Sequence, residues 1–136
     1  MDKIDRKIVD ILRKDGRATY IDIGNSVNLS EGAVRKRIKR LMDQGIIQHF
    51  SIKLGSVNGA KAIILLSTDT SIQTSKISQE LSQIPNVEMV YEITGEYDIA
   101  VIIWGSNIIE LNVCVEQIRH VKGVINTNTM IILREW

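Results

Sequence analysis

The spacing of apolar residues changes part-way along the 136-residue chain, and this change limits the folds open to it. Up to residue 45, apolar side chains recur every three or four residues, which is typical of amphipathic helices. From residue 60 onward, short apolar or alternating segments typical of strands are interspersed with two helical segments. The sequence therefore predicts an α+β protein in which a helical N-terminal domain precedes a domain of mixed strands and helices.

Three short helices are predicted in the first domain, over residues 1–45. The residues expected to face inward are Ile4, Ile8, Ile11 and Leu12 in the first, Tyr20, Ile23 and Val27 in the second, and Val34, Ile38 and Leu41 in the third. Thr19 and Ser30 are suited to cap the second and third helices, and Gly45 ends the last one. Because only Asn28-Leu29 connects the last two helices, these helices are predicted to form a helix-turn-helix unit.

The segment between the two domains, residues 46–59, is predicted to be a hinge strand followed by a linker. Residues 46–55 alternate like a strand, and residues 56–59 have the composition of a turn.

The second domain, residues 60–136, is predicted to have the element order βαββαβ. Strands are expected at 62–67, 87–94, 99–104 and 124–133, with helices at about 77–84 and 107–120. In the second helix Ile108, Leu111, Val115 and Ile118 should face inward, with Cys114 in or near the core. This order predicts a ferredoxin-like fold with both helices on one face of an antiparallel sheet. The other apolar face needs cover, so a dimer is expected.

Charge is divided unevenly between the two halves. Residues 1–58 hold twelve Lys and Arg against seven acids, a net charge of +5, whereas residues 59–136 hold five against nine, a net charge of −4. The basic residues concentrate in the third predicted helix, as Arg35, Lys36, Arg37, Lys39 and Arg40. On a helical wheel Lys36 and Lys39 point away from the core stripe, and no acid lies at i±4 within this run. The pattern favours a DNA-binding face over an ordinary solvated helix face.

Several classes of protein are disfavoured. The N-terminus is charged and no apolar run approaches the ~20 residues that span a bilayer, so a cytoplasmic protein without a membrane partner is expected. A single cysteine excludes an internal disulfide. No metal-binding or catalytic spacing is present, and His49 and His120 lie far apart, so no cofactor and no catalytic residue is expected. An enzyme built on a ferredoxin-like domain remains a remote alternative.

The full length of the chain resembles the leucine-responsive/asparagine-responsive (Lrp/AsnC) family of transcriptional regulators. The resemblance is carried by DKIDRKIVDILRKDGR at the N-terminus, LSEGAVRKRIKRLMDQGII over 29–47, TGEYDIAV over 94–101 and GVINTNTMIIL over 123–133. The family implies a winged helix-turn-helix, a hinge strand and a ferredoxin-like ligand-sensing domain. It also implies homodimers that assemble further, commonly into octamers. Gly24 departs from the family, which usually has alanine there.

Expected roles on the DNA side follow from the helix together with this resemblance. The third helix should enter the major groove, with Arg35 and Lys36 near base edges. Ser30 and Gly32 at the helix start should meet phosphate, while Lys39 and Arg40 hold the DNA backbone. Arg37 is open to two interpretations, a DNA contact or an ion pair to an acid of the first helix. Arg17, in a turn, is a weaker phosphate candidate.

The effector site is expected only from the resemblance. In the family the corresponding regions line a pocket between neighbouring dimers that holds a free amino acid. Here they supply the turn Gly95, Glu96, Tyr97 and Asp98, and Thr127, Asn128 and Thr129 of the last strand. Their polar side chains favour a polar ligand such as glutamine or asparagine. Taken without the resemblance, the same residues suit an ordinary hairpin turn and edge strand.

The functional expectation is a sequence-specific DNA-binding regulator modulated by a free amino acid. An effector-independent, architectural DNA-compacting protein is the alternative, because both classes use the same DNA-binding heads.

Overall fold

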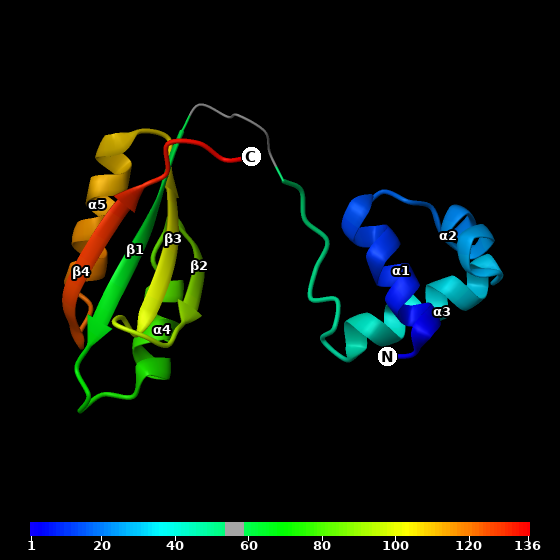
Figure 1. Ribbon diagram of the computed structural model, residues 1–136, viewed down its shortest axis with the longest axis horizontal. Coiled ribbons are helices and arrows are strands. Elements are labelled where there is room, and N and C mark those ends of the chain that lie inside the picture. Colours follow the sequence, from blue (N-terminus) through cyan, green and yellow to red (C-terminus); the bar gives the residue numbers. More distant parts are fainter. Residues whose placement is uncertain (54–58) are drawn as a thin grey trace. The chain divides into compact units, whose positions relative to one another are not determined.

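A computed structural model describes residues 1–53 and 59–136 of the chain. The chain divides into two compact units, Met1–Gly55 and Ser56–Trp136, and each is described by itself. The first holds helices α1 (Lys3–Lys14), α2 (Tyr20–Val27) and α3 (Glu31–Asp43); the second holds β1 (Ala60–Thr68), α4 (Thr74–Ser82), β2 (Val87–Glu92), β3 (Ile99–Gly105), α5 (Ile108–Arg119) and β4 (Val124–Ile131) (Figure 1).

Each helix of the first unit begins at a side chain that satisfies a free backbone amide. Asp2 and Asp5 form a reciprocal capping box at the start of α1. Thr19 accepts a hydrogen bond from the Asp22 amide, and Ser30 accepts one from the Ala33 amide, as the sequence predicts. The core consists of predicted inward-facing residues, with Ile8, Ile23, Val34 and Ile38 between 0% and 2% exposed. Gly45, at φ +68°, follows α3 in the left-handed conformation that favours glycine.

The turn between α2 and α3 explains why glycine occupies position 24. Asn28 adopts a left-handed conformation (φ 55°), and the Leu29 amide donates to the Gly24 carbonyl at 2.9 Å. A Cβ atom at position 24 would collide with the Leu29 carbonyl oxygen. Glycine costs about 1 kcal/mol of helix propensity relative to alanine. Because the turn approaches the helix so closely, this packing requires glycine at position 24 despite its lower helix propensity.

The strand predicted over residues 46–55 is not formed in the described part of that segment. Residues 46–53 contain neither helix nor strand, and residues 54 and 55 lie outside the described residues. A strand needs a neighbour to accept its ladder of hydrogen bonds. No described segment of the same chain pairs with residues 46–53. Of the turn predicted over 56–59, residues 56–58 also lie outside the described residues.

The second unit has the predicted βαββαβ order. Its sheet is antiparallel throughout, with strand order β2-β3-β1-β4. Alternate residues of β1 and β3 pack against buried residues of α4 and α5, so both helices cover the same face. The buried set is Ala62, Ile64, Leu66, Ile77, Leu81, Ile99, Val101, Ile103, Leu111, Cys114, Val115 and Ile118.

Two local expectations change. Ile108, predicted to face inward, is 58% exposed, because it begins α5 one turn before the part of the helix that packs on the sheet. In β2 the alternation is interrupted by a register shift between Val87 and Met89. Val87 and Val90 therefore pack against the core, whereas Met89 and Tyr91 project from the other face.

Candidate nucleic-acid interface and effector site

Helix α3 presents the exposed side that the helical wheel predicts. Val34, Ile38 and Leu41 are buried, while Lys36 and Lys39 are exposed on the opposite side. Gly32, near the start of the helix, is exposed, and no atom lies within 4 Å of the position a Cβ would occupy. At Gly32 the first turn of α3 thus exposes bare backbone on the side that carries Lys36 and Lys39, a surface that a phosphate can approach.

Three of the five basic residues of α3 have acidic partners, contrary to the expectation of an unrelieved run. Arg35 forms an i,i+4 ion pair with Glu31 at 2.7 Å, and its guanidinium carbon lies 5.3 Å from the centre of the Tyr20 ring. The expectation counted acids only within the run, whereas Glu31 lies just outside it. These contacts orient the Arg35 guanidinium toward the start of α3 and toward α2.

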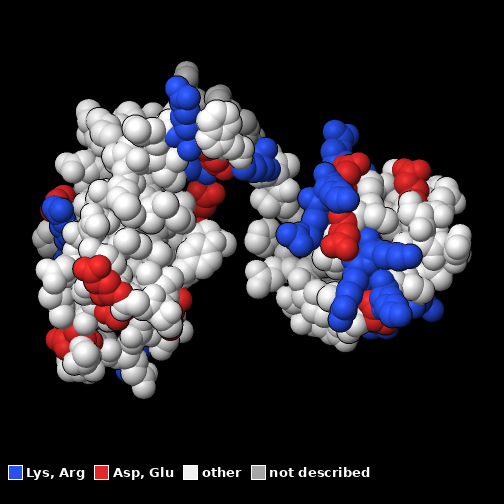
Figure 2. Space-filling view, in the orientation of Figure 1, with Lys and Arg blue, Asp and Glu red and all other residues white. Residues whose placement is uncertain are grey.

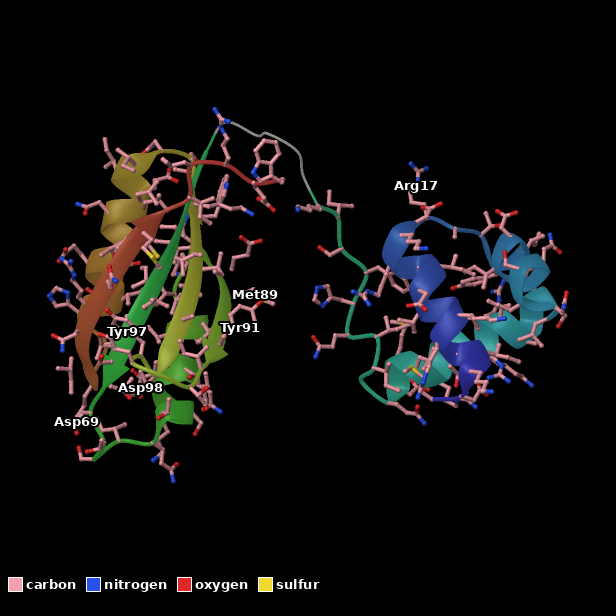
Figure 3. The ribbon with its side chains drawn as sticks, in the orientation of Figure 1. Arg17, Asp69, Met89, Tyr91, Tyr97 and Asp98 are labelled. Carbon is pink, nitrogen blue, oxygen red and sulfur yellow. The ribbon has the colours of Figure 1, made fainter. Side chains whose placement is uncertain are left out.

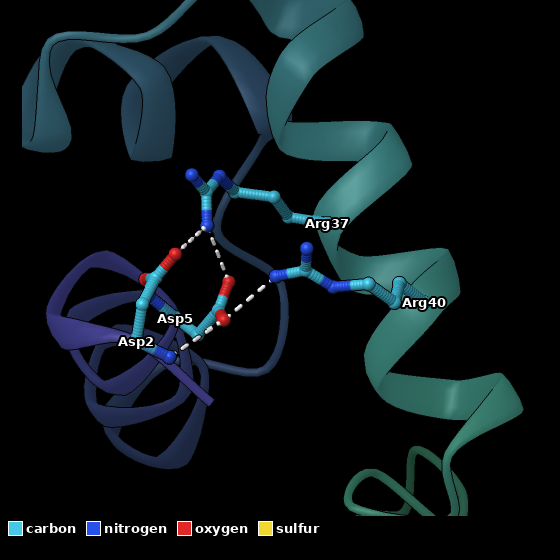
Figure 4. A network of polar contacts seen from close by, with 4 residues as sticks. All are labelled: Asp2, Asp5, Arg37 and Arg40. Atoms are coloured by element: carbon cyan, nitrogen blue, oxygen red, sulfur yellow. Dashed lines mark hydrogen bonds and ion pairs between the residues drawn. The ribbon is translucent and has the colours of Figure 1, made fainter.

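Arg37 and Arg40 join α3 to the start of α1 through two aspartates (Figure 4). Arg37 Nη1 lies 2.6 Å from an Asp2 carboxylate oxygen and 2.7 Å from one of Asp5. Arg40 Nη2 lies 2.7 Å from the other Asp5 oxygen. The Asp5 side chain is 1% exposed, so its charge is compensated by both guanidiniums and by the Asp2 amide at 2.9 Å. Of the two interpretations of Arg37, the structure shows the ion pair to the first helix.

The protonation equilibria of the two aspartates reflect this network. Hydrogen bonds from Arg37 and from the Asp5 amide lower the pKa of Asp2 to about 2. For Asp5, burial acts to raise the pKa, but hydrogen bonds from the Asp2 amide and Arg37, with the nearby Arg40 charge, outweigh it and lower the pKa. Both carboxylates are therefore ionised at neutral pH, and the network holds its full charge.

Lys36 and Lys39 are the two cations of the α3 run that form no ion pair among the described residues. Lysine and arginine side chains gather over this unit in the space-filling view (Figure 2). Arg17 lies in the connection between α1 and α2 and points outward from it (Figure 3).

The turn predicted to bind an effector connects β2 to β3. Within it Gly95 takes a positive φ of 119°, and the Ile93 amide donates to the Asp98 carbonyl at 2.9 Å. Asp98 is half-buried and already engaged, because its Oδ2 accepts from the Thr68 amide at 2.7 Å and from the Thr68 hydroxyl at 3.1 Å. Glu96 is exposed. Figure 3 shows Tyr97 and Asp98 at the same end of the sheet.

The three polar residues of β4 divide between the two faces of the sheet. Asn128 lies on the helix-free face, where its Nδ2 donates to the Tyr97 hydroxyl at 3.4 Å. Thr127 and Thr129 lie on the face covered by helices. The Thr127 hydroxyl accepts from Arg119 Nε at 3.2 Å, and the buried Thr129 hydroxyl has no hydrogen-bond partner among the described residues. Within one chain, the structure therefore brings Tyr97 and Asn128 together and leaves the two threonines apart from them.

A separate depression of about 570 Å³ lies where α4 and α5 end. It is lined by Glu80, Gln83, Ile84, Pro85, Gln117, His120, Val121 and Lys122. None of the residues predicted to bind an effector lines it.

The helix-free face of the sheet carries a continuous apolar surface, here called the open face. Ile63 and Leu65 of β1 and Ile102 of β3 are half-buried at its centre, and Met89, Tyr91, Trp104 and Met130 surround them, between 36% and 49% exposed. Met89 and Tyr91 project outward from β2 (Figure 3). An apolar sheet face of this kind marks an interaction surface.

The sequence offers an acid of the first helix as a partner of Arg37, but it does not identify Asp2 or Asp5 as that acid, nor Glu31 and Tyr20 as partners of Arg35. A signal for the first two was present, because Asp2 and Asp5 lie three residues apart at a helix start with few other acids nearby. Pairing them with Arg37 and Arg40 required the angle between α1 and α3, which helical periodicity does not give.

Other candidate chemistry is limited. Cys114 is buried with its thiol directed at the Pro85 carbonyl, and burial raises its pKa, so it is a poor nucleophile. Among the described residues no cluster of three or more metal-ligating side chains occurs. None of the described helices is both long and apolar enough to cross a membrane. His49 and His120 are both exposed and lie in different units.

A helix-turn-helix with a basic exposed recognition face, followed by a βαββαβ unit with an open apolar face, defines a DNA-binding protein with an attached α+β regulatory domain. Residues 1–48 match the family model described as winged helix-turn-helix DNA-binding, and residues 61–136 match the Lrp/AsnC ligand binding domain. The chain belongs to the Lrp/AsnC family of transcriptional regulators, and its relatives are regulators rather than enzymes.

The similarity extends over full-length proteins. The regulator LysM of Saccharolobus solfataricus is 44% identical over 136 residues, covering 100% of this chain and 96% of that protein. The regulator FL11 of Pyrococcus furiosus is 34% identical, covering 98% and 90%. The crystal structure of the Mycobacterium tuberculosis leucine response regulatory protein has a TM-score of 0.88 at 28% identity, covering 100% and 94%. A Neisseria meningitidis regulator solved as an L-methionine complex has a TM-score of 0.80 at 26% identity, covering 99% and 91%.

Proposed function

We propose that this transcriptional regulator recognises specific DNA sequences through α3 and that a free amino acid modulates its assembly or its DNA binding. The observation that carries the DNA half is the exposed side of α3, where Lys36, Lys39 and the bare start at Gly32 face solvent without acidic partners among the described residues. Since the DNA of the bacterial and archaeal relatives is cytoplasmic, the cytoplasm is where such a protein acts.

The contacts divide by chemistry. The Ser30 hydroxyl uses its oxygen to cap α3, so its proton can be donated to a phosphate, and the exposed Gly32 lets the DNA backbone approach. Lys36, one residue beyond the Glu31-bound Arg35, extends from the same N-terminal half and is suited to a base edge. Arg35 reads a base when its guanidinium exchanges Glu31 for guanine. Lys39 and the half-exposed Arg40 hold phosphates, while Arg37 is assigned to the α1–α3 contact.

Arg35→Ala and Lys39→Ala are expected to weaken DNA binding in different ways. Arg35→Ala should reduce the preference for the specific site over random DNA by roughly tenfold, because a bidentate guanine contact is worth about 1–3 kcal/mol. Lys39→Ala should weaken specific and random DNA alike and lower the salt slope by about 0.9. Fluorescence anisotropy on both DNAs at several salt concentrations measures this. Equal losses on specific and random DNA for both variants would rule out the division of roles.

The amino-acid half of the proposal is supported by family membership and by a relative's structure solved with L-methionine. In this chain the turn 95–98 and Asn128 meet at one end of the open face. Backbone amides of the turn can receive a carboxylate, and the second oxygen of Asp98 can accept from an ammonium group. Tyr97 and Asn128 make a polar ligand such as glutamine or asparagine the expected class. By linkage, a ligand that prefers one assembly shifts DNA affinity.

Effector binding is expected to appear in calorimetry against the twenty amino acids, with a polar member binding at millimolar concentration or tighter. Asn128→Ala should weaken that binding by roughly tenfold, since a hydrogen bond left unmade costs about 1–3 kcal/mol. Tyr91→Phe is the matched control, because Tyr91 is on the same face but away from the turn. Absence of binding for all twenty amino acids would make the protein an effector-independent regulator.

DNA footprinting distinguishes a sequence-specific regulator from the architectural, DNA-compacting alternative. A short protected pseudo-palindrome supports a specific regulator, because a two-fold dimer reads two half-sites about one helical turn or more apart. Protection that spreads without a boundary supports compaction instead.

The assembly expected of this chain is a homodimer through the open face, extended to a higher oligomer with the octamer as the expected form. A second apolar area supports the further step: Ile108, Ile109 and Val113 of α5 are 58%, 72% and 54% exposed. It lies on the helix side of the sheet, so both surfaces can be used at once.

A further inference from the structure

Helix α1 carries a basic surface of its own, which the proposed function does not use. All five of its Lys and Arg residues are exposed: Lys3, Arg6, Lys7, Arg13 and Lys14. At 100° per residue they fall within one arc of about 120° that contains none of the apolar residues Ile4, Ile8 and Ile11. Asp10 is the only acid in that arc. This exposed surface is here called the α1 stripe.

The charge of the α1 stripe is not relieved by neighbouring acids. None of its five cations forms an ion pair among the residues that the structure describes, although three of the five in α3 do. Arg119 of α5 shows the ordinary arrangement, with Glu116 at 2.8 Å. Like charges this close repel one another, and an external polyanion would remove that repulsion.

The α1 stripe and the exposed side of α3 each point away from the core of the three-helix unit. Ile8 of α1 and Val34 and Ile38 of α3 face each other in the core, so each basic surface points away from it. The Asp2–Asp5–Arg37–Arg40 network joins α1 to α3, and in it acids neutralise the cations (Figure 4). The stripe is therefore a basic surface distinct from the one that α3 presents to DNA.

We propose that the α1 stripe binds the phosphate backbone of a second segment of duplex DNA, without sequence preference, while α3 holds its own site. From Lys3 to Lys14 the helix extends about 16 Å, at 1.5 Å per residue. That length spans roughly five phosphates of one strand at about 3.4 Å each. The inference rests on the proposed function, because α3 is taken as the helix that reads the first segment.

Duplex DNA fits this surface better than the acidic second unit of another copy. DNA offers one negative charge per about 1.7 Å of its axis, a density that matches a continuous stripe. The second unit has a net charge of only −4, and Glu88, Glu116 and Asp98 are already engaged by partners within it. Lysine and arginine without aromatic neighbours favour phosphate contact over base stacking.

The test compares random-sequence duplexes of two lengths, 24 and 300 base pairs, by anisotropy and by gel shift over a range of salt. The triple variant Lys3→Gln/Lys7→Gln/Lys14→Gln should lose less than about threefold in affinity on the short duplex, which only α3 needs to hold. On the long duplex it should lose roughly tenfold or more, with the salt slope lower by about 2 to 3. Asp10→Asn should act oppositely and tighten binding to the long duplex.

The α3 variant Lys36→Gln/Lys39→Gln is the comparison, because it should weaken binding to both lengths, whereas the triple variant should largely spare the short duplex. If that variant binds both duplexes as the parent does, the proposed function fails while the stripe remains testable by the triple variant. The proposal for the α1 stripe is overturned if the triple variant loses affinity equally for both duplex lengths, or for neither. Asp10→Asn tests the stripe independently of the triple variant, because it makes the same surface more positive and a gain in affinity cannot come from misfolding.

Discussion

Replacing Asp5 with alanine is expected to lower the free energy of unfolding of the N-terminal unit by about 3 kcal/mol, because removing one member of a buried ionic network is strongly destabilising. Asp5 is 1% exposed and is the member of the network that both arginines contact. Its loss leaves Arg37 with Asp2 alone, removes the acid that pairs with Arg40, and removes one half of the capping box of α1. The free energy of unfolding of a unit of this size is small, so a loss of this magnitude is a large fraction of it.

Hydrogen exchange followed by mass spectrometry on the full chain locates the effect. Amides of α1 and α3 should exchange faster in Asp5→Ala, and amides of the β1–β4 sheet should keep their rates, since the two units have separate cores. Asp10→Ala is the matched control. It removes an exposed acid that forms no ion pair with any described residue from the same helix, and it should change stability by less than about 0.5 kcal/mol. Equal effects for the two variants would contradict a stabilising role of the network.

The same network determines how the unit responds to acid. Asp2 and Asp5 both have lowered pKa values in the folded chain, to about 2 for Asp2. Groups with a depressed folded pKa stabilise the fold above their unfolded pKa, about 3.9 for aspartate, and lose this contribution as the pH falls through the folded value. Stability of α1 and α3 should therefore be level from pH 7 to about 5 and decline below about pH 4. In Asp5→Ala the decline should be smaller.

The fold was predictable because its determinants are local. Helical periodicity, the caps at Thr19 and Ser30 and the alternation of strands are properties of adjacent residues, and they placed nearly every element correctly. Where the prediction failed, the missing information was a partner. Residues 46–53 alternate like a strand but have no strand beside them in the described part of the chain. The register shift in β2 depends on how that strand meets β3, so the exposure of Met89 and Tyr91 could not be read from alternation.

The site was predictable only in part, for a related reason. A helical wheel shows which side chains of α3 point outward, but it does not show which acidic residues of α1 and of the start of α3 contact them. Arg35, Arg37 and Arg40 each form an ion pair with an acid that lies outside the run of five basic residues. Lys36 and Lys39 are therefore the cations most available to DNA. Likewise Thr127 and Thr129 look equivalent to Asn128 in sequence, yet strand alternation sends them to the opposite face.

Ile102→Arg is expected to convert the assembled protein to monomers. Ile102 lies at the centre of the open face, opposite Ile63 of β1 and Met89 of β2. In a monomer the new guanidinium reaches water, so the fold is retained. In a dimer closed through this face it would be buried without a partner, which costs several kcal/mol. The dimer dissociation constant should rise at least about 100-fold, equivalent to about 2.7 kcal/mol.

Two further isoleucine-to-arginine variants separate the possible assemblies in sedimentation velocity and light scattering. Ile109→Arg on α5 should stop growth at the dimer, because it alters the second apolar area and leaves the open face intact. Ile21→Arg, at a 59% exposed position of α2 in the other unit, should keep the full assembly. A mass for Ile102→Arg equal to that of the parent would exclude the open face as the dimer interface. A parent mass of eight chains that falls to two in Ile109→Arg would make the octamer a ring or stack of open-face dimers.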